Sequence, residues 1–285
     1  KNLSFTKASQ ELFVSQPAIT KHIQELEAAY QTRLFDRQGS RISLTEAGKL
    51  LLEHCERILE DYKRLEYEMH LLHNEYTGGL KLGASTTVAQ YVLPPLLASF
   101  IGKFPHVNLS LLNGNSREIE AALQEHRIDL GFVEGVFRLP NIKYTTFLKD
   151  ELVAVVRTGS KLAIGEEITP EELLHLPLVL RERGSGTLDV FERALQQHNI
   201  KLSSLQVLMY LGSTESIKLF LEHTDCLGIV SIRSITRELY SGQLRVVEIK
   251  DMPMLRDFSF AQPQGQESGL AQVFMQFAMH NNNKL

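Results

Sequence analysis

The hydrophobic positions of the first 30 residues predict two short amphipathic helices joined by a tight turn. Ser4 can cap the first helix and Ser15 the second, and Pro17 is tolerated in a first helical turn. Apolar residues recur at helical spacing behind each cap, so each helix is expected to bury one stripe. The stripes comprise Phe5, Ala8 and Leu12 in the first helix and Ala18, Ile19, Ile23 and Leu26 in the second.

A short hairpin, or wing, is expected after the two helices. Residues 33–37 and 41–44 alternate apolar and polar positions, and Gln38-Gly39-Ser40 between them is a turn signal. Residues 1–44 are therefore predicted to form a winged helix-turn-helix domain.

A long amphipathic helix is predicted from Glu46, behind the capping residue Thr45, to about Tyr76. Its apolar residues recur at alternating steps of four and three, which is the heptad pattern of a coiled coil. One exposed seam of this length is unstable in water, so we expect residues 45–77 to pair two chains; packing within its own domain is the alternative. The seam comprises Leu51, Cys55, Ile58, Tyr62, Leu65, Met69, Leu72 and Tyr76.

From Leu80 onward, short β-rich segments alternate with helical ones, which predicts parallel sheet in α/β units. The first set has strands at 80–84, 107–112, 128–133 and 151–156 and helices at 88–102 and 116–126. The second set has strands at 176–180, 205–210, 227–231 and 244–249 and helices at 188–198, 214–223 and 232–240. A last strand (258–261) and helix (267–280) can return to the first set. We expect two lobes joined by crossing strands, with lobe I at 78–157 and 257–285 and lobe II at 158–256.

Composition excludes several protein classes. Hydrophobic residues make up 43% of the chain and charged residues 22%, as in ordinary globular domains, and no apolar run reaches the roughly 20 residues of a membrane span. Cys55 and Cys226 are far apart, which argues against a disulfide framework and favours the cytoplasm. The net charge is −4, but residues 1–44 carry +2 and the rest −6, a distribution compatible with DNA binding.

The polar face of the second helix has the residue types that read DNA in the major groove. Gln can contact adenine with two hydrogen bonds, Thr can contact a thymine methyl, and Lys can reach guanine or phosphate. Basic and hydroxyl residues of the wing can hold the DNA backbone. The expected DNA-binding residues are Ser15, Gln16, Pro17, Thr20, Lys21, Gln24, Arg37, Ser40 and Arg41. The alternative is a solvated face on an ordinary helical pair.

Turns that follow the predicted strands form a candidate site for a small anion. Each offers hydroxyls and backbone N–H groups where a helix begins, and two turns come from each lobe. Arg181 or Arg183 can add a charge-assisted contact. The expected residues are Ser85, Thr86, Thr87, Ser116, Glu134, Arg183, Ser185, Thr187, Ser213 and Thr214. The alternatives are that the hydroxyls only cap helices and that Glu134 is a solvated rim residue.

Catalytic, metal and cofactor sites are not expected. Cys226 follows His223 closely but begins an apolar strand, which favours a core position. His54, Cys55, His70 and His73 lie on the long helix, but only Cys55 is on the seam and no complete set of four zinc ligands presents itself. Neither GxxxxGK[ST] nor a GxGxxG after a strand is present. We therefore expect no enzyme, although a stand-alone α/β ligand-binding protein or enzyme with a helical head that does not bind DNA remains the alternative.

The segment SFTKASQELFVSQPAITKHIQELEAAYQTRLFDRQGSRISLTEAG (residues 4–48) resembles the DNA-binding head of the LysR-type transcriptional regulators. Weaker similarities are IDLGFVEG (128–135), ERGSGT (182–187), STESIK (213–218) and LGIVS (227–231). The resemblance implies a bacterial, cytoplasmic repressor or activator with a two-lobed effector domain like a periplasmic binding protein. It further implies pairing through linker helices into a homodimer or homotetramer, and promoter or operator DNA, a small effector and RNA polymerase as partners. The family's head begins with a further helix, and only Lys1-Asn2-Leu3 precede SFTKAS, so a truncated head is expected.

Overall fold

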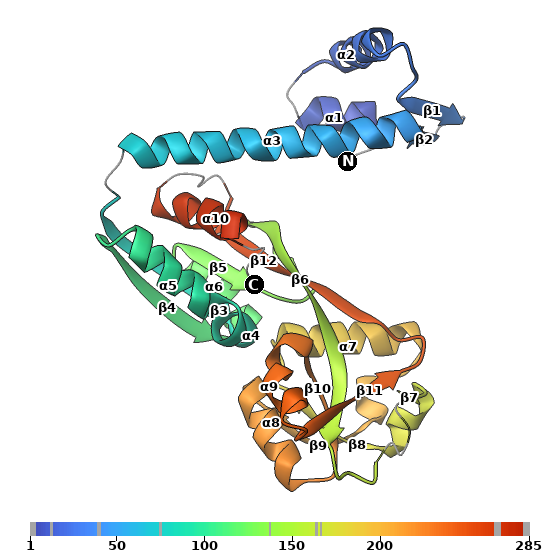
Figure 1. The fold of residues 1–285 in the computed structure, drawn as a ribbon. Helices are drawn as coiled ribbons and strands as arrows, with labels where there is room; N and C mark the ends of the chain where they lie inside the picture. Colours follow the sequence, from blue (N-terminus) through green and yellow to red (C-terminus); the bar gives the residue numbers. More distant parts are fainter. Residues whose placement is uncertain are drawn as a thin grey trace. The chain divides into compact units, whose positions relative to one another are not determined.

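The computed structural model describes residues 4–11, 14–38, 41–73, 76–136, 138–162, 165, 167–264 and 269–281. The chain forms two compact units, residues 1–74 and 75–285, whose elements are labelled in Figure 1. Among the described helices, none combines the length and the hydrophobicity that a membrane span requires.

Two helices begin the N-terminal unit, as predicted. Helix α1 spans Phe5–Glu11 and α2 spans Gln16–Ala29. The side chain of Ser15 caps α2, because its Oγ accepts a hydrogen bond from the Ala18 amide at 3.4 Å. The first stripe's last residue, Leu12, lies outside the described residues.

The predicted burial of the α2 stripe is only partly correct. Ala18, Ile19 and Ile23 are half-buried, but Leu26 is 40% exposed. The reason is length: α1 packs against α2 but has 7 residues, whereas α2 has 14, so α1 cannot cover the whole stripe.

A β-hairpin forms the wing, as predicted. Strand β1 (Phe35–Gln38) pairs antiparallel with β2 (Arg41–Leu44), and Gly39-Ser40 between them lie outside the described residues. The Phe35 ring packs edge-on against Phe5 of α1, with ring centroids 5.6 Å apart. This aromatic contact joins the wing to the first helix.

Helix α3 spans Glu46–His73, 28 residues and about 42 Å. Thr45 caps it, since its Oγ1 accepts from the Gly48 amide at 2.9 Å. Gly48 is required at this point because a Cβ there would lie 2.1 Å from the carbonyl oxygen of Leu34. The helix ends before Tyr76, so the predicted extension to Tyr76 is wrong: this ring packs edge-on against Phe104 of the C-terminal unit instead.

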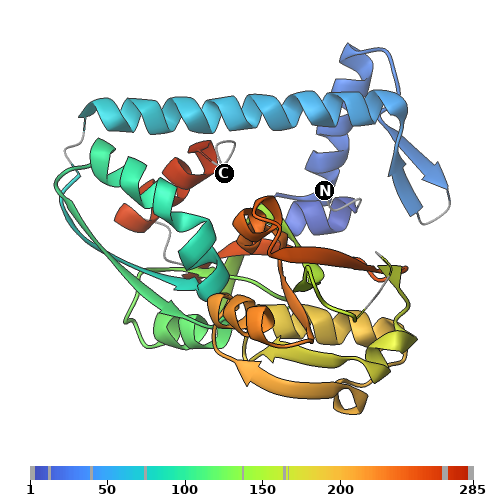
Figure 2. The ribbon, with the colours of Figure 1, turned by 60° about the horizontal axis from the view of Figure 1, so that its bottom comes forward.

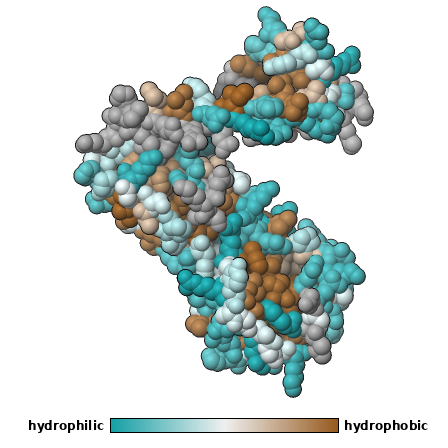
Figure 3. Space-filling view, viewed as in Figure 1, coloured by the Kyte–Doolittle hydropathy of each residue, from teal (hydrophilic) through white to brown (hydrophobic). Residues whose placement is uncertain are grey.

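The middle of the α3 seam, from Ile58 to Met69, is open to solvent in the single chain. The exposed fractions are 66% for Ile58, 56% for Tyr62 and 55% for Leu65. Figure 3 shows that hydrophobic side chains lie at the surface of the N-terminal unit. The alternative that the seam packs within its own domain is therefore not supported by the described residues of that unit.

The C-terminal unit is built on one sheet with strand order β4-β3-β5-β12-β6-β10-β8-β9, in which β11 pairs with β6 and with β7. Strands β3, β4 and β5 pair in parallel, as do β10, β8 and β9. The strands are β3 Gly78–Ser85, β4 Val107–Gly114, β5 Leu130–Val133, β6 Ile142–Arg157, β7 Glu167–Ile168, β8 Pro177–Arg181, β9 Gln206–Leu211, β10 Leu227–Ser231, β11 Leu244–Ile249 and β12 Met254–Pro263. The predicted parallel α/β units are confirmed.

Two long antiparallel strands join the parallel groups. Strand β6 pairs with β12 from Ile142 to Leu152 and then with β10 and β11. The predicted strand at 151–156 is therefore too short, because polar residues such as Lys143 and Lys149 interrupt the apolar run although the backbone stays extended. We name the groups on either side of this crossing the first lobe (β3–β5, α4–α6 and α10) and the second lobe (β7–β11 and α7–α9).

Helices cover both lobes (Figure 2). They are α4 Thr86–Tyr91, α5 Leu93–Lys103, α6 Ser116–Gln124, α7 Gly186–Gln197, α8 Thr214–His223, α9 Thr236–Tyr240 and α10 Leu270–Asn281, with 3₁₀ turns η1 Glu171–His175, η2 Leu202–Ser204 and η3 Ile232–Ser234. The single helix predicted at 88–102 is wrong. Two helices meet at Val92, because Pro94 and Pro95 lack the amide hydrogens that would continue α4.

The core of the first lobe explains why the C-terminus returns to it. Phe274 and Phe277 of α10 pack on Phe100 of α5, with ring centroids 4.8 and 5.2 Å apart. Phe132 of β5 and Phe260 of β12 continue this aromatic cluster. The predicted return of the last strand and helix is confirmed.

Candidate functional site

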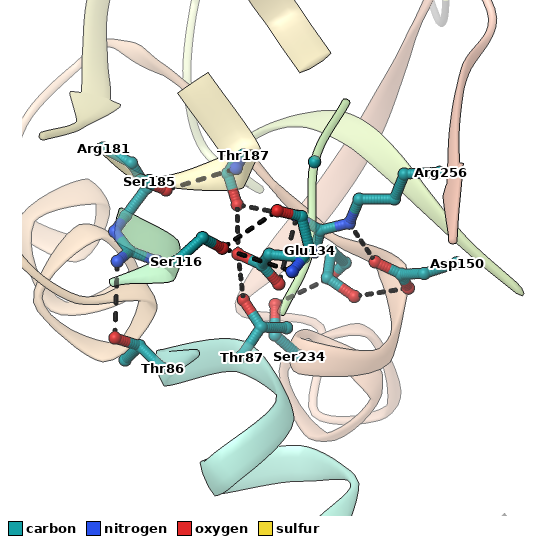
Figure 4. A network of polar contacts seen from close by, with 12 residues as sticks. Thr86, Thr87, Ser116, Glu134, Asp150, Arg181, Ser185, Thr187, Ser234 and Arg256 are labelled. Atoms are coloured by element: carbon teal, nitrogen blue, oxygen red, sulfur yellow. Dashed lines mark hydrogen bonds and ion pairs between the residues drawn. The ribbon is translucent and has the colours of Figure 1, made fainter. Parts of the chain in front are cut away.

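Turns that follow strands of both lobes meet where the lobes face each other (Figure 4). In parallel α/β sheets the carboxyl ends of neighbouring strands lie at one edge, and helices begin there. The predicted hydroxyl residues occupy these positions: Ser85 at the end of β3, Thr86 and Thr87 directly after it, Ser116 after β4, Ser185 and Thr187 after β8, and Ser213 and Thr214 after β9. All of them except Ser213 are buried.

Helix capping accounts for some of these hydroxyls, as the alternative interpretation predicts. Ser185 Oγ accepts from the Thr187 amide at 3.2 Å, and Ser213 Oγ accepts from the Ser216 amide at 3.1 Å. Ser85 Oγ is buried and makes no hydrogen bond to any described residue. The Oγ1 atoms of Thr87 and Thr187 instead donate to a side chain between the lobes.

That side chain is Glu134, which directly follows β5 and is 4% exposed. Its Oε1 accepts hydrogen bonds from Thr87 Oγ1 of the first lobe and Thr187 Oγ1 of the second, each at 3.3 Å. Its Oε2 lies 3.2 Å from Arg256 Nη1, an ion pair that lacks hydrogen-bond geometry. The alternative that Glu134 is a solvated rim residue is therefore excluded.

The backbone of Glu134 is held separately from its carboxylate. Ser116 Oγ donates to the Glu134 carbonyl at 2.9 Å and accepts from the Glu134 amide at 3.2 Å. The next residue, Gly135, has a φ of +103°, and a Cβ there would lie 2.8 Å from the Cα of Gly186. A Cβ on Gly186 would lie 2.2 Å from the Glu134 carbonyl oxygen. Glycine at both positions lets the two lobes touch backbone to backbone.

Arg256 and Asp150 form a buried ion pair on the crossing strands. They lie opposite each other on β12 and β6, with Arg256 Nε 2.7 Å from Asp150 Oδ2. Ser231 Oγ donates to Asp150 Oδ1 at 2.7 Å, and Arg256 Nη1 donates to Thr187 Oγ1 at 3.0 Å. Sequence analysis missed this pair, because Asp150 lies between Lys149 and Glu151 and Arg256 lies next to Asp257, so neither residue stands out as a buried charge in its own strand.

Arg181, at the end of β8, is the second buried guanidinium of the cluster. Its Nη2 donates to Thr86 Oγ1 at 3.4 Å and to the Gly212 carbonyl at 3.3 Å, which joins the lobes. Of the two arginines that the sequence offered for this role, Arg183 is exposed and lies outside the cluster. The difference follows from its position, because the strand ends at Arg181 and Arg183 falls in the loop before α7.

A second polar contact joins the lobes beside the cluster. Tyr91 of α4 donates to Glu215 of α8, and Lys218 Nζ lies 2.8 Å from Glu215 Oε1. Burial raises the pKa of Tyr91, and the bond to Glu215 raises it further. Burial acts to raise the pKa of Glu215, but the hydrogen bonds from Lys218 and Tyr91 outweigh it and lower the pKa. Tyr91 therefore stays a donor and Glu215 a charged acceptor at neutral pH.

The DNA-binding residues predicted on the second helix lie on α2 or at its cap. Ser15, Gln16 and Pro17 are exposed at its start, and Lys21 and Gln24 are exposed further along. Thr20 is half-buried, and its hydroxyl donates to the Gln16 carbonyl at 3.1 Å. Arg37 and Arg41 lie on β1 and β2 of the wing, and Ser40 lies outside the described residues.

Cys226 is a core residue, as expected. Its side chain is fully buried, and burial, with a smaller effect of Asp225, raises the pKa of the thiol to about 11. Within the described part of the chain, no three His, Cys, Asp or Glu side chains are placed to hold a metal ion.

We expect Cys226 to resist thiol reagents in the folded protein, because the thiolate is the reactive form. In a Cys55→Ser background at pH 8, a chromogenic disulfide reagent should titrate almost no thiol in native protein and one thiol in urea. Native-state reaction at the rate of a free cysteine would contradict the buried position.

Two family models match the chain. Residues 1–49 match "Bacterial regulatory helix-turn-helix protein, lysR family", and residues 73–282 match "LysR substrate binding domain". The chain is also similar to the uncharacterized HTH-type transcriptional regulator YeiE of Escherichia coli K12. The two are 34% identical over 249 residues, which cover 87% of this chain and 82% of that relative.

Solved structures are similar to one unit or to the whole chain. The regulatory domain of CcmR from Synechocystis PCC6803, in complex with 2-PG, has a TM-score of 0.65 and 27% identity, covering 72% of this chain and 97% of that domain. CrgA from Neisseria meningitidis, a LysR-type transcriptional regulator, has a TM-score of 0.73 and 20% identity, covering 98% of this chain and 93% of its own. The second likeness concerns the fold alone.

Proposed function

The chain belongs to the LysR family of bacterial transcriptional regulators, and from this premise we propose that a small anion bound between its two lobes controls how it binds promoter or operator DNA. Family membership excludes the alternative of an enzyme or a stand-alone binding protein, because both matched domains are those of regulators. We place its action in the cytoplasm, where the DNA is.

The environment of the Glu134 carboxylate is the observation that supports an anionic effector. Hydroxyls from both lobes donate to it, and the buried guanidinium of Arg256 lies beside it. Donors and cations arranged around one buried carboxylate can bind the carboxylate or oxyanion of a ligand in the same way. The regulatory domain of CcmR, in complex with 2-PG, supports an anion as the ligand class.

A change in the arrangement of the two lobes can couple ligand binding to DNA binding. A ligand that bridges Thr87 and Thr187 contacts both lobes, so it stabilises the arrangement in which these residues are closest. An effector shifts the population of arrangements only as far as it binds one better than the other. We propose that two bodies move relative to each other, namely lobe I (residues 78–157 and 257–285) and lobe II (residues 158–256).

Two paired chains present two winged helix-turn-helix domains to the DNA. We propose that α3, within the linker 45–77, pairs two chains along its exposed seam and thereby sets the separation of the two half-sites. Two such dimers can join into a homotetramer, and RNA polymerase is a further partner of a regulator bound at a promoter.

Residues of α2 and residues of the wing are proposed to contact different parts of the DNA. Gln16 and Thr20, with Ser15, Pro17, Lys21 and Gln24, are proposed to meet bases or phosphates in the major groove. Arg37, Ser40 and Arg41 are proposed to hold the backbone from the wing.

Gln16→Ala should reduce discrimination between operator and unrelated DNA by about 1–3 kcal/mol, because it removes a contact to a base edge. Arg41→Ala should weaken binding to all sequences alike and reduce the salt dependence, because it removes a phosphate contact. Fluorescence anisotropy with both duplexes at several salt concentrations measures these effects. If both variants lost specificity to the same extent, the assignment would be wrong.

A gel shift on the DNA upstream of the protein's own gene tests the function as a whole. The full chain should retard this fragment at low salt, and the affinity should fall steeply as salt rises, since phosphate contacts release counterions. Absence of retardation at low salt would reject DNA regulation as the function of this chain.

A further inference from the structure

We infer that Glu134 is a built-in occupant of the effector site, whose carboxylate an incoming anion must displace from Thr87, Thr187 and Arg256. This inference rests on the proposed function, because it concerns the same site between the lobes. It adds that the site is closed by a residue of the chain itself, and that the ligand competes with this residue.

The contacts of Glu134 are those that a free anion would make. One oxygen receives a hydroxyl from each lobe, and the other faces a guanidinium whose side chain is fully buried. Ser85 and Arg181, near the site, are also buried. Ser85 Oγ and Arg181 Nη1 have no hydrogen-bond partner among the described residues. The site therefore has donors to spare beyond those that Glu134 uses.

Glu134 holds these partners loosely in comparison with a structural carboxylate of the same cluster. Its hydroxyl contacts are 3.3 Å long, and the contact to Arg256 is an ion pair without hydrogen-bond geometry. Asp150, by contrast, receives 2.7 Å hydrogen bonds from Arg256 and from Ser231. Charge-assisted hydrogen bonds are shorter and stronger than these loose contacts, so the Glu134 carboxylate is the one that a ligand can replace.

Displacement can proceed by rotation of the Glu134 side chain. Ser116 fixes the amide and the carbonyl of Glu134, so the backbone can stay in place. A cavity of about 520 Å³ adjoins it, lined by Gly135, Arg138 and Arg256 among others. Arg138, Lys149 and Arg193 on its lining offer a displaced carboxylate cationic partners, beside the acidic Asp150 and Asp257.

The competition sets which ligands succeed. A compact anion with two or more acceptor oxygens can replace both contacts of Glu134 at once and can also use the spare donors near Arg181. A neutral molecule would separate Arg256 from the Glu134 carboxylate and would supply no negative charge in its place. We therefore assign the effector to the class of compact oxyanions or carboxylates.

The test measures binding of sodium acetate and sodium sulfate to the full chain by calorimetry, with ionic strength held constant with sodium chloride. Glu134→Ala vacates the site, so at least one of the two anions should bind this variant about tenfold or more tighter than the unaltered chain. The same anion should raise the unfolding temperature of Glu134→Ala more than that of the unaltered chain. Glu222→Gln, an exposed carboxylate change on α8, is the matched control and should behave like the unaltered chain.

Anion affinities of Glu134→Ala that are equal to or lower than those of the unaltered chain, or no binding at all, would overturn the inference. If Glu134→Ala does not fold, Glu134→Gln replaces it: the neutral amide pairs less well with Arg256, and anion affinity should rise about threefold or more. Unchanged or lower affinity in Glu134→Gln would overturn it equally. A gel shift on the same samples separates this failure from failure of the proposed function, because DNA binding can persist when the anion result is negative.

Discussion

Replacing Arg256 with methionine is expected to lower the free energy of unfolding by about 3–5 kcal/mol. The Arg256 side chain is fully buried and lies between two carboxylates, 2.7 Å from Asp150 and 3.2 Å from Glu134. Removing it leaves Glu134 without its cation and leaves Asp150 with the more distant Arg233, whose Nε lies 3.8 Å away, and an uncompensated buried charge costs more than the ion pair itself contributes. Urea unfolding followed by circular dichroism measures the change.

Arg193→Met is the matched control for Arg256→Met. Arg193 is an exposed residue of α7 that lines the same cavity, so its replacement should change stability by less than about 0.5 kcal/mol. A loss of less than about 1 kcal/mol for Arg256→Met would mean that the two carboxylates find other compensation, and the cluster would not be the structural centre of the interlobe site.

Introducing glutamate at both Ile58 and Leu65 of α3 is expected to separate paired chains and to weaken operator binding by roughly 10²–10⁴-fold. These side chains are exposed in the single chain and lie one heptad apart on the seam. Charges that face each other across a helix pair oppose its formation. A single head then loses the gain in effective concentration that a joined pair provides.

Sedimentation velocity at micromolar protein and fluorescence anisotropy with operator DNA measure the two effects of the Ile58→Glu, Leu65→Glu variant. Leu50→Glu is the matched control, because Leu50 is exposed on α3 but lies off the heptad seam. If the double variant stayed paired and kept its affinity, α3 would not be the pairing element.

Local chemistry made much of the fold predictable. The caps Ser15 and Thr45, the pairing of β1 with β2 and the heptad spacing of α3 each depend on residues close in sequence. Alternation of apolar strands and amphipathic helices was enough to place the α/β units. Pro94 and Pro95 were also a local signal, since two prolines should have divided the helix predicted at 88–102.

Contacts between residues far apart in sequence were not predictable in the same way. Arg256 and Asp150 are 106 positions apart, and Tyr91 and Glu215 are 124 apart, so neither pair leaves a local pattern. The choice between Arg181 and Arg183 depended on where β8 ends, and strand ends are the least certain part of a periodicity argument. The hydroxyl residues between the lobes were easier to predict, because the turns that follow the strands of a parallel sheet lie at one edge of that sheet.

The most direct test of the central claim, that an anion site lies between the lobes, is a crystal structure of the full chain grown in sodium sulfate. The account predicts sulfate density within hydrogen-bond distance of Thr87, Thr187 and Arg256, with the Glu134 side chain turned away from them. Sulfate confined to the cavity beside Gly135, Arg138 and Arg193, with Glu134 still bound to both threonines, would contradict it.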